Sequence, residues 1–216
     1  MKAVTNASGL RSMGMLVCLV AMLCARVPAF AQELPELNQI VVSGSLADLE
    51  MRLRGETWTK DELGAALIAA AGVNKPEHAS ALLSNGADVD FAVLGRTALI
   101  VAAYENSVDA ALVLLMSKAD PNYVSTFDWR PLHNTMREGV SNDEMILLLL
   151  THGAEIDAPT NLLVTPLHRA AGFCLGSAVR ILIDGGANSG LRDKYGQTAA
   201  DRANKAGCSE VARLLE

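Results

Sequence analysis

The sequence has no surplus of positive charge, and this argues against one broad class of function. Its 216 residues contain 18 Lys and Arg against 24 Asp and Glu, so the formal net charge is −6. A protein that binds nucleic acid without regard to sequence needs a basic surface that neutralises phosphates. We therefore expect no nucleic-acid partner.

The common short motifs of catalysis are absent as well. Beyond residue 31 the sequence contains no Gly-x-Ser-x-Gly, no His-Glu-x-x-His, no phosphate-binding glycine loop and no acidic calcium loop. An enzyme would have to assemble its site from residues that follow none of these patterns. An unrecognised enzyme is therefore only a remote alternative, and we expect neither a cofactor nor a metal ion.

An apolar run near the start of the chain is too short to span a bilayer comfortably. It covers residues 13–25, after Lys2 and Arg11 and before the small residue Ala31. This pattern is typical of a secretory signal peptide cleaved after Ala31, whereas a spanning helix needs about 20 apolar residues. We predict a signal peptide at residues 1–31 and a periplasmic or secreted protein without a stable membrane anchor. A retained anchor is the alternative.

Cysteine is scarce, which excludes a fold held together by disulfides. The chain has four cysteines, and Cys18 and Cys24 leave with the predicted signal peptide. Only Cys174 and Cys208 remain, and two cysteines do not make a disulfide framework. The fold must therefore depend on its hydrophobic core.

The sequence does contain one short phrase in five imperfect copies. It is clearest as TPLHRAAG, and the copies are spaced by 32, 33, 35 and 33 residues, beginning at Ala65, Thr97, Arg130, Thr165 and Thr198. A second phrase, seen as NGAD, SKAD, HGAE and GGAN, has its alanine 22 residues after the start of three copies and 24 after Arg130. Two phrases locked to one period of about 33 residues indicate a repeat array.

Each copy is expected to form two helices followed by an extended turn, as the copy from Thr165 illustrates. The Thr165 hydroxyl can cap a helix, and Pro166 suits the first helical position, where no amide donor is needed. The small residues Ala170 and Ala171 then let a neighbouring helix approach closely. A second helix within 177–186 ends at paired glycines, and a polar glycine-rich turn follows.

These phrases resemble the ankyrin repeat, with its Gly-x-Thr-Pro-Leu-His-x-Ala-Ala, Leu-Leu and Gly-Ala-Asp segments. The resemblance implies an all-α solenoid of helix-turn-helix units with β-hairpin-like connecting loops. Together with the predicted signal peptide, it leads us to expect a secreted or periplasmic ankyrin-repeat protein of bacterial type. It covers residues 63–216 as about five repeats, the last one truncated. A weaker leading copy from Leu37 suggests that residues 32–62 form an N-terminal capping repeat.

The copy that begins at Arg130 departs most from the pattern. Arg130 replaces the capping threonine, and the stretch MREGVSNDEM carries two extra residues between the expected helices. We therefore expect a longer loop between these helices, on the side opposite the hairpins.

Two residue pairs occupy equivalent positions in neighbouring copies. A shared metal at His133 and His168 is not expected, because packed helices lie about 8–10 Å apart whereas zinc lies about 2 Å from each nitrogen; the resemblance implies hydrogen-bonding residues instead. Cys174 and Cys208 form the second pair. A disulfide needs α-carbons within about 7 Å, less than the usual repeat spacing, so unpaired thiols are the favoured interpretation and a bond is the alternative.

The resemblance implies a protein partner that binds on the concave side, which is made by the hairpin tips and the first helices. One apolar residue recurs near the end of each connecting stretch, at Leu94, Phe127, Leu162 and Tyr195, and Trp129 lies beside this row. The row is either an interaction stripe or a set of side chains that pack hairpin against hairpin, and the packing interpretation is slightly favoured.

The first helices supply the other candidate contacts. The positions expected to face the concave side are Tyr104, Arg137, Arg169, Phe173 and Arg202. Bases among aromatic rings suit an acidic protein segment, although an ordinary solvated helix face would have the same composition. We therefore expect a monomeric, noncatalytic binding module, with a dedicated inhibitor or immunity-type modulator of one exported enzyme or toxin as the alternative.

Overall fold

The computed structural model describes residues 36–126 and 128–216. The predicted signal peptide at residues 1–31 and the candidate contact Phe127 lie outside these ranges. Among the described residues, no helix combines the length and the apolar character that crossing a membrane requires.

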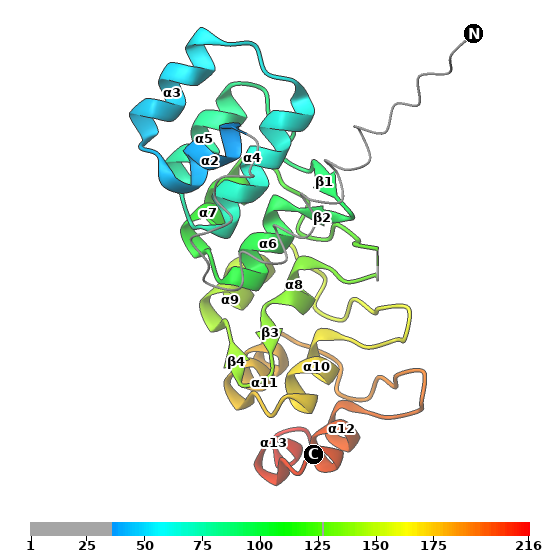
Figure 1. Ribbon diagram of the computed structural model, residues 1–216. Helices are drawn as coiled ribbons and strands as arrows, with labels where there is room; N and C mark the ends of the chain where they lie inside the picture. The colour runs from blue at the N-terminus through cyan, green and yellow to red at the C-terminus, as the bar shows by residue number, and fades with distance from the viewer. Residues whose placement is uncertain (1–35, 127) are drawn as a thin grey trace, which may run out of the picture.

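The described chain forms two parallel rows of helices, and consecutive members of each row pack on one another (Figure 1). The inner row consists of α2 (Glu36–Ser43), α4 (Lys60–Gly72), α6 (Ala98–Glu105), α8 (Pro131–Asn134), α10 (Pro166–Gly172) and α12 (Ala199–Lys205). The outer row consists of α3 (Leu46–Gly55), α5 (Pro76–Ser84), α7 (Val108–Met116), α9 (Asp143–Thr151), α11 (Gly176–Asp184) and α13 (Ser209–Arg213). The predicted all-α solenoid of helix pairs is confirmed.

Two very short antiparallel strand pairs complete the secondary structure of the described residues. The first pair, β1 (Ala92–Val93) and β2 (Arg96–Thr97), forms a hairpin in the connecting stretch before α6. The second pair, β3 (Met136–Arg137) and β4 (Val140–Ser141), lies between α8 and α9. The longer connection expected in this copy is therefore present, on the side away from the other connecting stretches (Figure 1).

Threonine caps start four of the inner helices, including α4, which is capped by Thr59. The hydroxyl oxygens of Thr97, Thr165 and Thr198 each accept a hydrogen bond from the amide three residues later. These bonds satisfy amides that have no partner within the helix. Arg130 supplies no such side-chain cap, and α8 is only four residues long.

Alanines form the contact between neighbouring inner helices. Ala102 in α6, Ala170 in α10 and Ala203 in α12 are completely buried. Their short side chains allow adjacent helices to pack closely, while larger residues such as Leu132 and Leu167 fill the space towards the outer row.

The connecting stretches are joined to one another by polar contacts that the repeat pattern did not predict. The carboxylate of Asp90 accepts the Asp120 amide at 3.1 Å, and the carboxylate of Asp157 accepts the Asn188 amide at 3.0 Å. In the intervening repeat, the Asn122 side-chain amide donates to the Gly153 carbonyl at 2.9 Å. Each turn is thus positioned by the turn next to it.

Two buried histidines, His133 and His168, form hydrogen bonds as expected, and these bonds link neighbouring repeats. The ring Nε2 of His133 lies 3.2 Å from the Val164 carbonyl oxygen, and Nε2 of His168 lies 3.0 Å from the Gln197 carbonyl oxygen. The Nδ1 atom of each ring faces the start of its own helix. Burial lowers the pKa of His133 to about 4 and also lowers the pKa of His168, which favours the neutral form of both rings in the folded stack.

We expect stability to fall as the solution is acidified from pH 6.5 to about pH 4. An unfolded histidine binds a proton below pH 6.5, whereas folded His133 stays neutral until about pH 4. Protonation therefore favours the unfolded chain, by about 3 kcal/mol across this window at roughly 1.4 kcal/mol per pKa unit. Urea melts at pH 7 and pH 4.5 measure the loss. His133→Gln should show a shallower pH dependence, and a slope equal to that of the wild type would contradict this assignment.

The two cysteines form a disulfide bond, so the interpretation that they are unpaired thiols is wrong. Cys174 lies in the turn after α10, Cys208 lies just before α13, and their α-carbons are 5.6 Å apart. This distance is shorter than the usual spacing between repeats, on which the prediction of unpaired thiols relied. The alanine contact between α10 and α12 lets the two turns approach one another. The bond joins the last repeat to the one before it.

Candidate functional site

The candidate residues lie on the surface made by the inner helices and the connecting stretches that precede them. We call this surface the inner face; it corresponds to the expected concave side, and Figure 1 shows the connecting stretches projecting beside α6, α8, α10 and α12. The opposite surface, made by the exposed sides of α3, α5, α7, α9, α11 and α13, is the outer face.

The tips of the connecting stretches expose apolar side chains. Leu94 is 53% exposed, Leu162 is 39% exposed and Tyr195 is 71% exposed. Each of these three side chains thus leaves part of its apolar surface open to a partner, whatever packing the hairpins make with one another. Leu94 adopts a left-handed backbone conformation with φ of +50°, which is uncommon for a residue with a side chain. The turn thus directs an apolar group outwards at an energetic cost.

Further along the inner face, one arginine lies between two aromatic rings. The guanidinium carbon of Arg169 is 4.1 Å from the ring centre of Trp129 and 4.9 Å from that of Phe173. Trp129 comes from the preceding repeat, whereas Phe173 follows the last residue of α10. The structure therefore brings together three residues that the sequence placed on this face.

The position of Arg169 is fixed by a hydrogen bond as well as by the rings. Its Nε donates to the Met136 carbonyl oxygen at 2.8 Å. Burial lowers the pKa of Arg169 to about 10, and the nearby hydroxyl of Tyr104 opposes this decrease. The guanidinium remains charged at neutral pH although it is partly removed from water.

A second cluster of the same kind surrounds Tyr104 at the end of α6. The guanidinium carbons of Arg137 and Arg96 lie 4.5 Å and 5.7 Å from the Tyr104 ring centre. Arg137 belongs to strand β3, so its expected position on a first helix is wrong. Because α8 ends at Asn134, the strand carries Arg137 to the tyrosine instead.

Arg202 differs from Arg169 because its charge is already paired. It donates from Nε and Nη2 to one carboxylate oxygen of buried Asp193, at 2.9 Å and 2.7 Å. Although burial raises the pKa of Asp193, the amides of Gln197 and Tyr195 and the Arg202 guanidinium hold that pKa below its ordinary value. Arg202 thus fixes the connecting stretch that presents Tyr195.

An open hollow of about 510 Å³ lies beside this ion pair on the inner face. Residues from three repeat elements line it, namely Gly172, Tyr195, Gln197, Arg202, Lys205 and Ala206. The exposed Tyr195 ring forms one side, and Lys205 brings a positive charge. The candidate contacts near the end of the array therefore surround a depression that a partner's side chain can enter.

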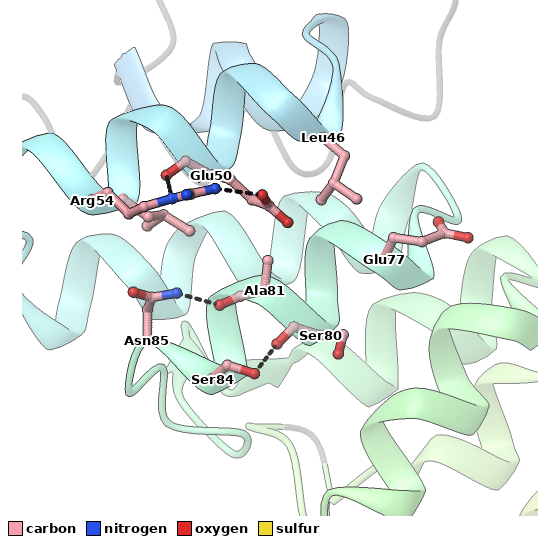
Figure 2. A pocket seen from close by; sticks show the side chains of 9 residues that line it. Leu46, Glu50, Arg54, Glu77, Ser80, Ala81, Ser84 and Asn85 are labelled. Atoms are coloured by element: carbon pink, nitrogen blue, oxygen red, sulfur yellow. Dashed lines mark hydrogen bonds and ion pairs between the residues drawn. The ribbon is translucent and has the colours of Figure 1, made fainter.

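A hollow of similar size, about 540 Å³, lies on the outer face between α3 and α5 (Figure 2). Most of its polar side chains are bonded within their own helices, while Figure 2 shows no hydrogen bond or ion pair at Glu77. Arg54 pairs with Glu50 at 2.7 Å, and the side chains of Ser84 and Asn85 donate to carbonyl oxygens one turn earlier at 2.8 Å. The outer hollow offers fewer groups for a ligand than the inner face does.

The part of the chain that the structure describes contains no group of three or more His, Cys, Asp or Glu side chains arranged to hold a metal ion.

The model of the family described as ankyrin repeats (3 copies) matches residues 37–125 and 132–216. The chain belongs to the ankyrin-repeat family. The ankyrin match extends to Leu37, so it includes the helices α2 and α3 that precede the clear copies of the phrase.

Several curated ankyrin relatives show how such stacks occur in other proteins. A mitochondrial disaggregase from Bos taurus is 35% identical over 158 residues, which are 70% of this chain and 22% of that protein. A B-cell lymphoma 3 protein homolog from Mus musculus is 31% identical over 171 residues, 76% of this chain and 36% of that protein. This chain therefore spans about a fifth of the first relative and about a third of the second.

A smaller ankyrin relative is matched over most of its length. Cyclin-dependent kinase 4 inhibitor B from Rattus norvegicus is 33% identical over 118 residues, which are 54% of this chain and 88% of that protein. The ankyrin family and its regulatory relatives are generally noncatalytic, and together they support a protein-interaction module.

The ankyrin phrase predicted which residues lie on the inner face, but it did not predict the contacts that hold the arginines of this face in place. Asp193 is buried against Arg202, and no sequence pattern marked it as part of the site. The spacing of Trp129 and Arg169 across a repeat boundary was the available signal for the stacked cluster. Recognising this cluster would have required knowing which residues of neighbouring repeats lie side by side.

Proposed function

We propose that this ankyrin-repeat protein is a noncatalytic module that binds a protein partner through its inner face. The observation that carries the proposal is the combination, on one surface, of exposed apolar tips and stacked arginines. Leu94, Leu162 and Tyr195 expose apolar area at the turns, while Arg137 and Arg169 are held against aromatic rings. Aromatic residues and arginine are the types that most often dominate protein interfaces.

The proposal includes export to the periplasm of a bacterium or to the exterior. Two features support it: the apolar run with preceding bases and a small residue at Ala31, and the disulfide between Cys174 and Cys208. Disulfides persist mainly in oxidising compartments. In this proposal the working protein begins after residue 31 and acts as a monomer.

A dedicated modulator of one exported enzyme or toxin is the second candidate. The inhibitor from Rattus norvegicus supports it, because this chain matches 88% of that protein and its name describes inhibition of a single kinase. An ankyrin stack of this size can therefore constitute nearly all of an inhibitor. The number of partners distinguishes the candidates: one stoichiometric enzyme or toxin favours the modulator, whereas several unrelated proteins favour the general module.

Capture from the exported proteins of the producing organism tests the proposed surface. We expect Leu162→Ser with Tyr195→Ser to weaken capture at least about tenfold, because these side chains are exposed in the free protein and become buried in the proposed complex. Leu112→Ser with Met116→Ser is the matched control, since it removes exposed apolar groups from α7 on the outer face. Quantitative pull-down with each folded variant measures the effect.

The control pair should capture the partner as well as the wild type does. Loss of capture only in the control pair, or equal capture by both folded variants, would show that the partner does not use the inner face.

A further inference from the structure

Arg169 is held so that one edge of its guanidinium remains available. Its plane is covered by the Trp129 and Phe173 rings, and its Nε is occupied by the Met136 carbonyl oxygen. The other two nitrogens, Nη1 and Nη2, make no hydrogen bond to any residue within 36–126 or 128–216. The free edge therefore consists of two nitrogens side by side, which is the arrangement that binds both oxygens of a carboxylate.

Three arginines on this part of the inner face make no ion pair with any residue that the structure describes. In the described ranges, ion pairs are made by Arg52, Arg54, Arg130, Arg192 and Arg202, and not by Arg96, Arg137 or Arg169. The Nε of Arg137 is moreover buried and has no hydrogen-bond partner among the residues that the structure describes. These three positive charges occur in a chain whose net charge is −6.

Partly buried charges without a partner are costly, and an incoming negative group relieves that cost. Both arginines lie at strand β3: Arg169 donates from Nε to the carbonyl oxygen of Met136 at 2.8 Å, and Arg137, the next residue, has its guanidinium carbon 4.5 Å from the Tyr104 ring centre. A ligand at this place can therefore reach two guanidinium groups at once.

We propose that the Arg137–Arg169 cluster binds the carboxylate side chains of an acidic, extended segment of the partner protein. This inference rests on the proposed function and specifies the chemistry of the partner. Arg169 receives one carboxylate through Nη1 and Nη2, and Arg137 attracts a second. Trp129 and Phe173 exclude water from one side of these contacts and offer apolar surface to the residues between the acids.

The test uses a blocked peptide of twelve residues in which Glu alternates with Ser, carrying a fluorescent label. Two comparison peptides have Gln or phosphoserine in place of every Glu. We expect fluorescence anisotropy to show binding of the Glu peptide and at least about tenfold weaker binding of the Gln peptide. NMR signals of the Trp129 indole and the Arg169 Nε–H group should shift on addition of the Glu peptide.

The decisive variant is Arg169→Lys, which keeps the charge but removes the pair of parallel donors and the flat stacking surface. We expect it to weaken the Glu peptide about tenfold. Arg180→Lys on the exposed side of α11 is the matched control and should bind as the wild type does. Thermal melts confirm that both variants remain folded.

Unchanged binding by Arg169→Lys, equal binding of the Gln peptide, or selective binding of the phosphoserine peptide would each overturn the proposal. If the Glu peptide does not bind while Leu162→Ser with Tyr195→Ser still abolishes capture of the partner, the inference of an acidic segment is wrong and the proposed function is retained. If the Glu peptide binds but Leu162→Ser with Tyr195→Ser captures the partner as well as the wild type does, the proposed function is wrong instead.

Discussion

Leu167→Asp will unfold most of the array, whereas Leu215→Asp will only loosen the last helix pair. Leu167 lies in α10 and is completely buried, while Leu215 is partly buried beyond α13 at the end of the stack. Each repeat in such an array contacts only its neighbours, so a disruption within it removes two interfaces and one at the end removes a single interface. A buried unpaired carboxylate adds a penalty that exceeds the loss of the side chain.

Denaturant melts of both variants measure this difference. We expect a loss of more than about 4 kcal/mol for Leu167→Asp, the upper part of the range for truncation of buried leucines, and about 1 kcal/mol for Leu215→Asp. Both changes introduce the same charge into the same residue type, so each serves as the control for the other. Equal losses would contradict an array whose stability depends on neighbour contacts.

Removing the disulfide should have the next largest effect on stability. Cys174 and Cys208 are separated by 34 residues, and cross-linking a loop of this length lowers the entropy of the unfolded chain by an amount worth about 4 kcal/mol. We expect Cys174→Ser with Cys208→Ser to lose roughly that free energy of unfolding. The loss should concentrate in α12 and α13, because the bond ties them to the preceding repeat.

Urea melts with and without a thiol reductant provide the measurement. Reductant should destabilise the wild type and leave the double serine variant unchanged, because the variant has no remaining cysteine after residue 31. A wild type that is equally stable with and without reductant would show that the bond does not contribute to the folded protein.

Much of the helical framework follows from a few residues. Thr97, Thr165 and Thr198 predict three helix starts because a hydroxyl that accepts a backbone amide hydrogen bond acts locally. The hydrogen-bonding role of His133 and His168 was also predicted, since both belong to the repeated phrase, although their partners in the next repeat were not. Local interactions and strict periodicity are the properties that a single sequence records well.

Other features depend on contacts between repeats and could not be predicted in the same way. The short α8 and the position of Arg137 in β3 result from two extra residues whose backbone path the sequence does not specify. The 5.6 Å separation of Cys174 and Cys208 depends on how closely two turns approach. Arg169 and Arg202 occupy the same position in adjacent repeats, yet one stacks on rings and the other pairs with Asp193.

Site-specific photo-cross-linking tests the central claim that a protein partner binds the inner face. A photoreactive phenylalanine analogue replaces Tyr195 on the inner face or Met116 on the outer face, two side chains that are 71% and 70% exposed. Equal exposure gives both probes the same access to solvent, so the yield of each reports where the partner lies. We predict a cross-linked complex from position 195 and none from position 116. A cross-linked complex from position 116 alone would contradict the account.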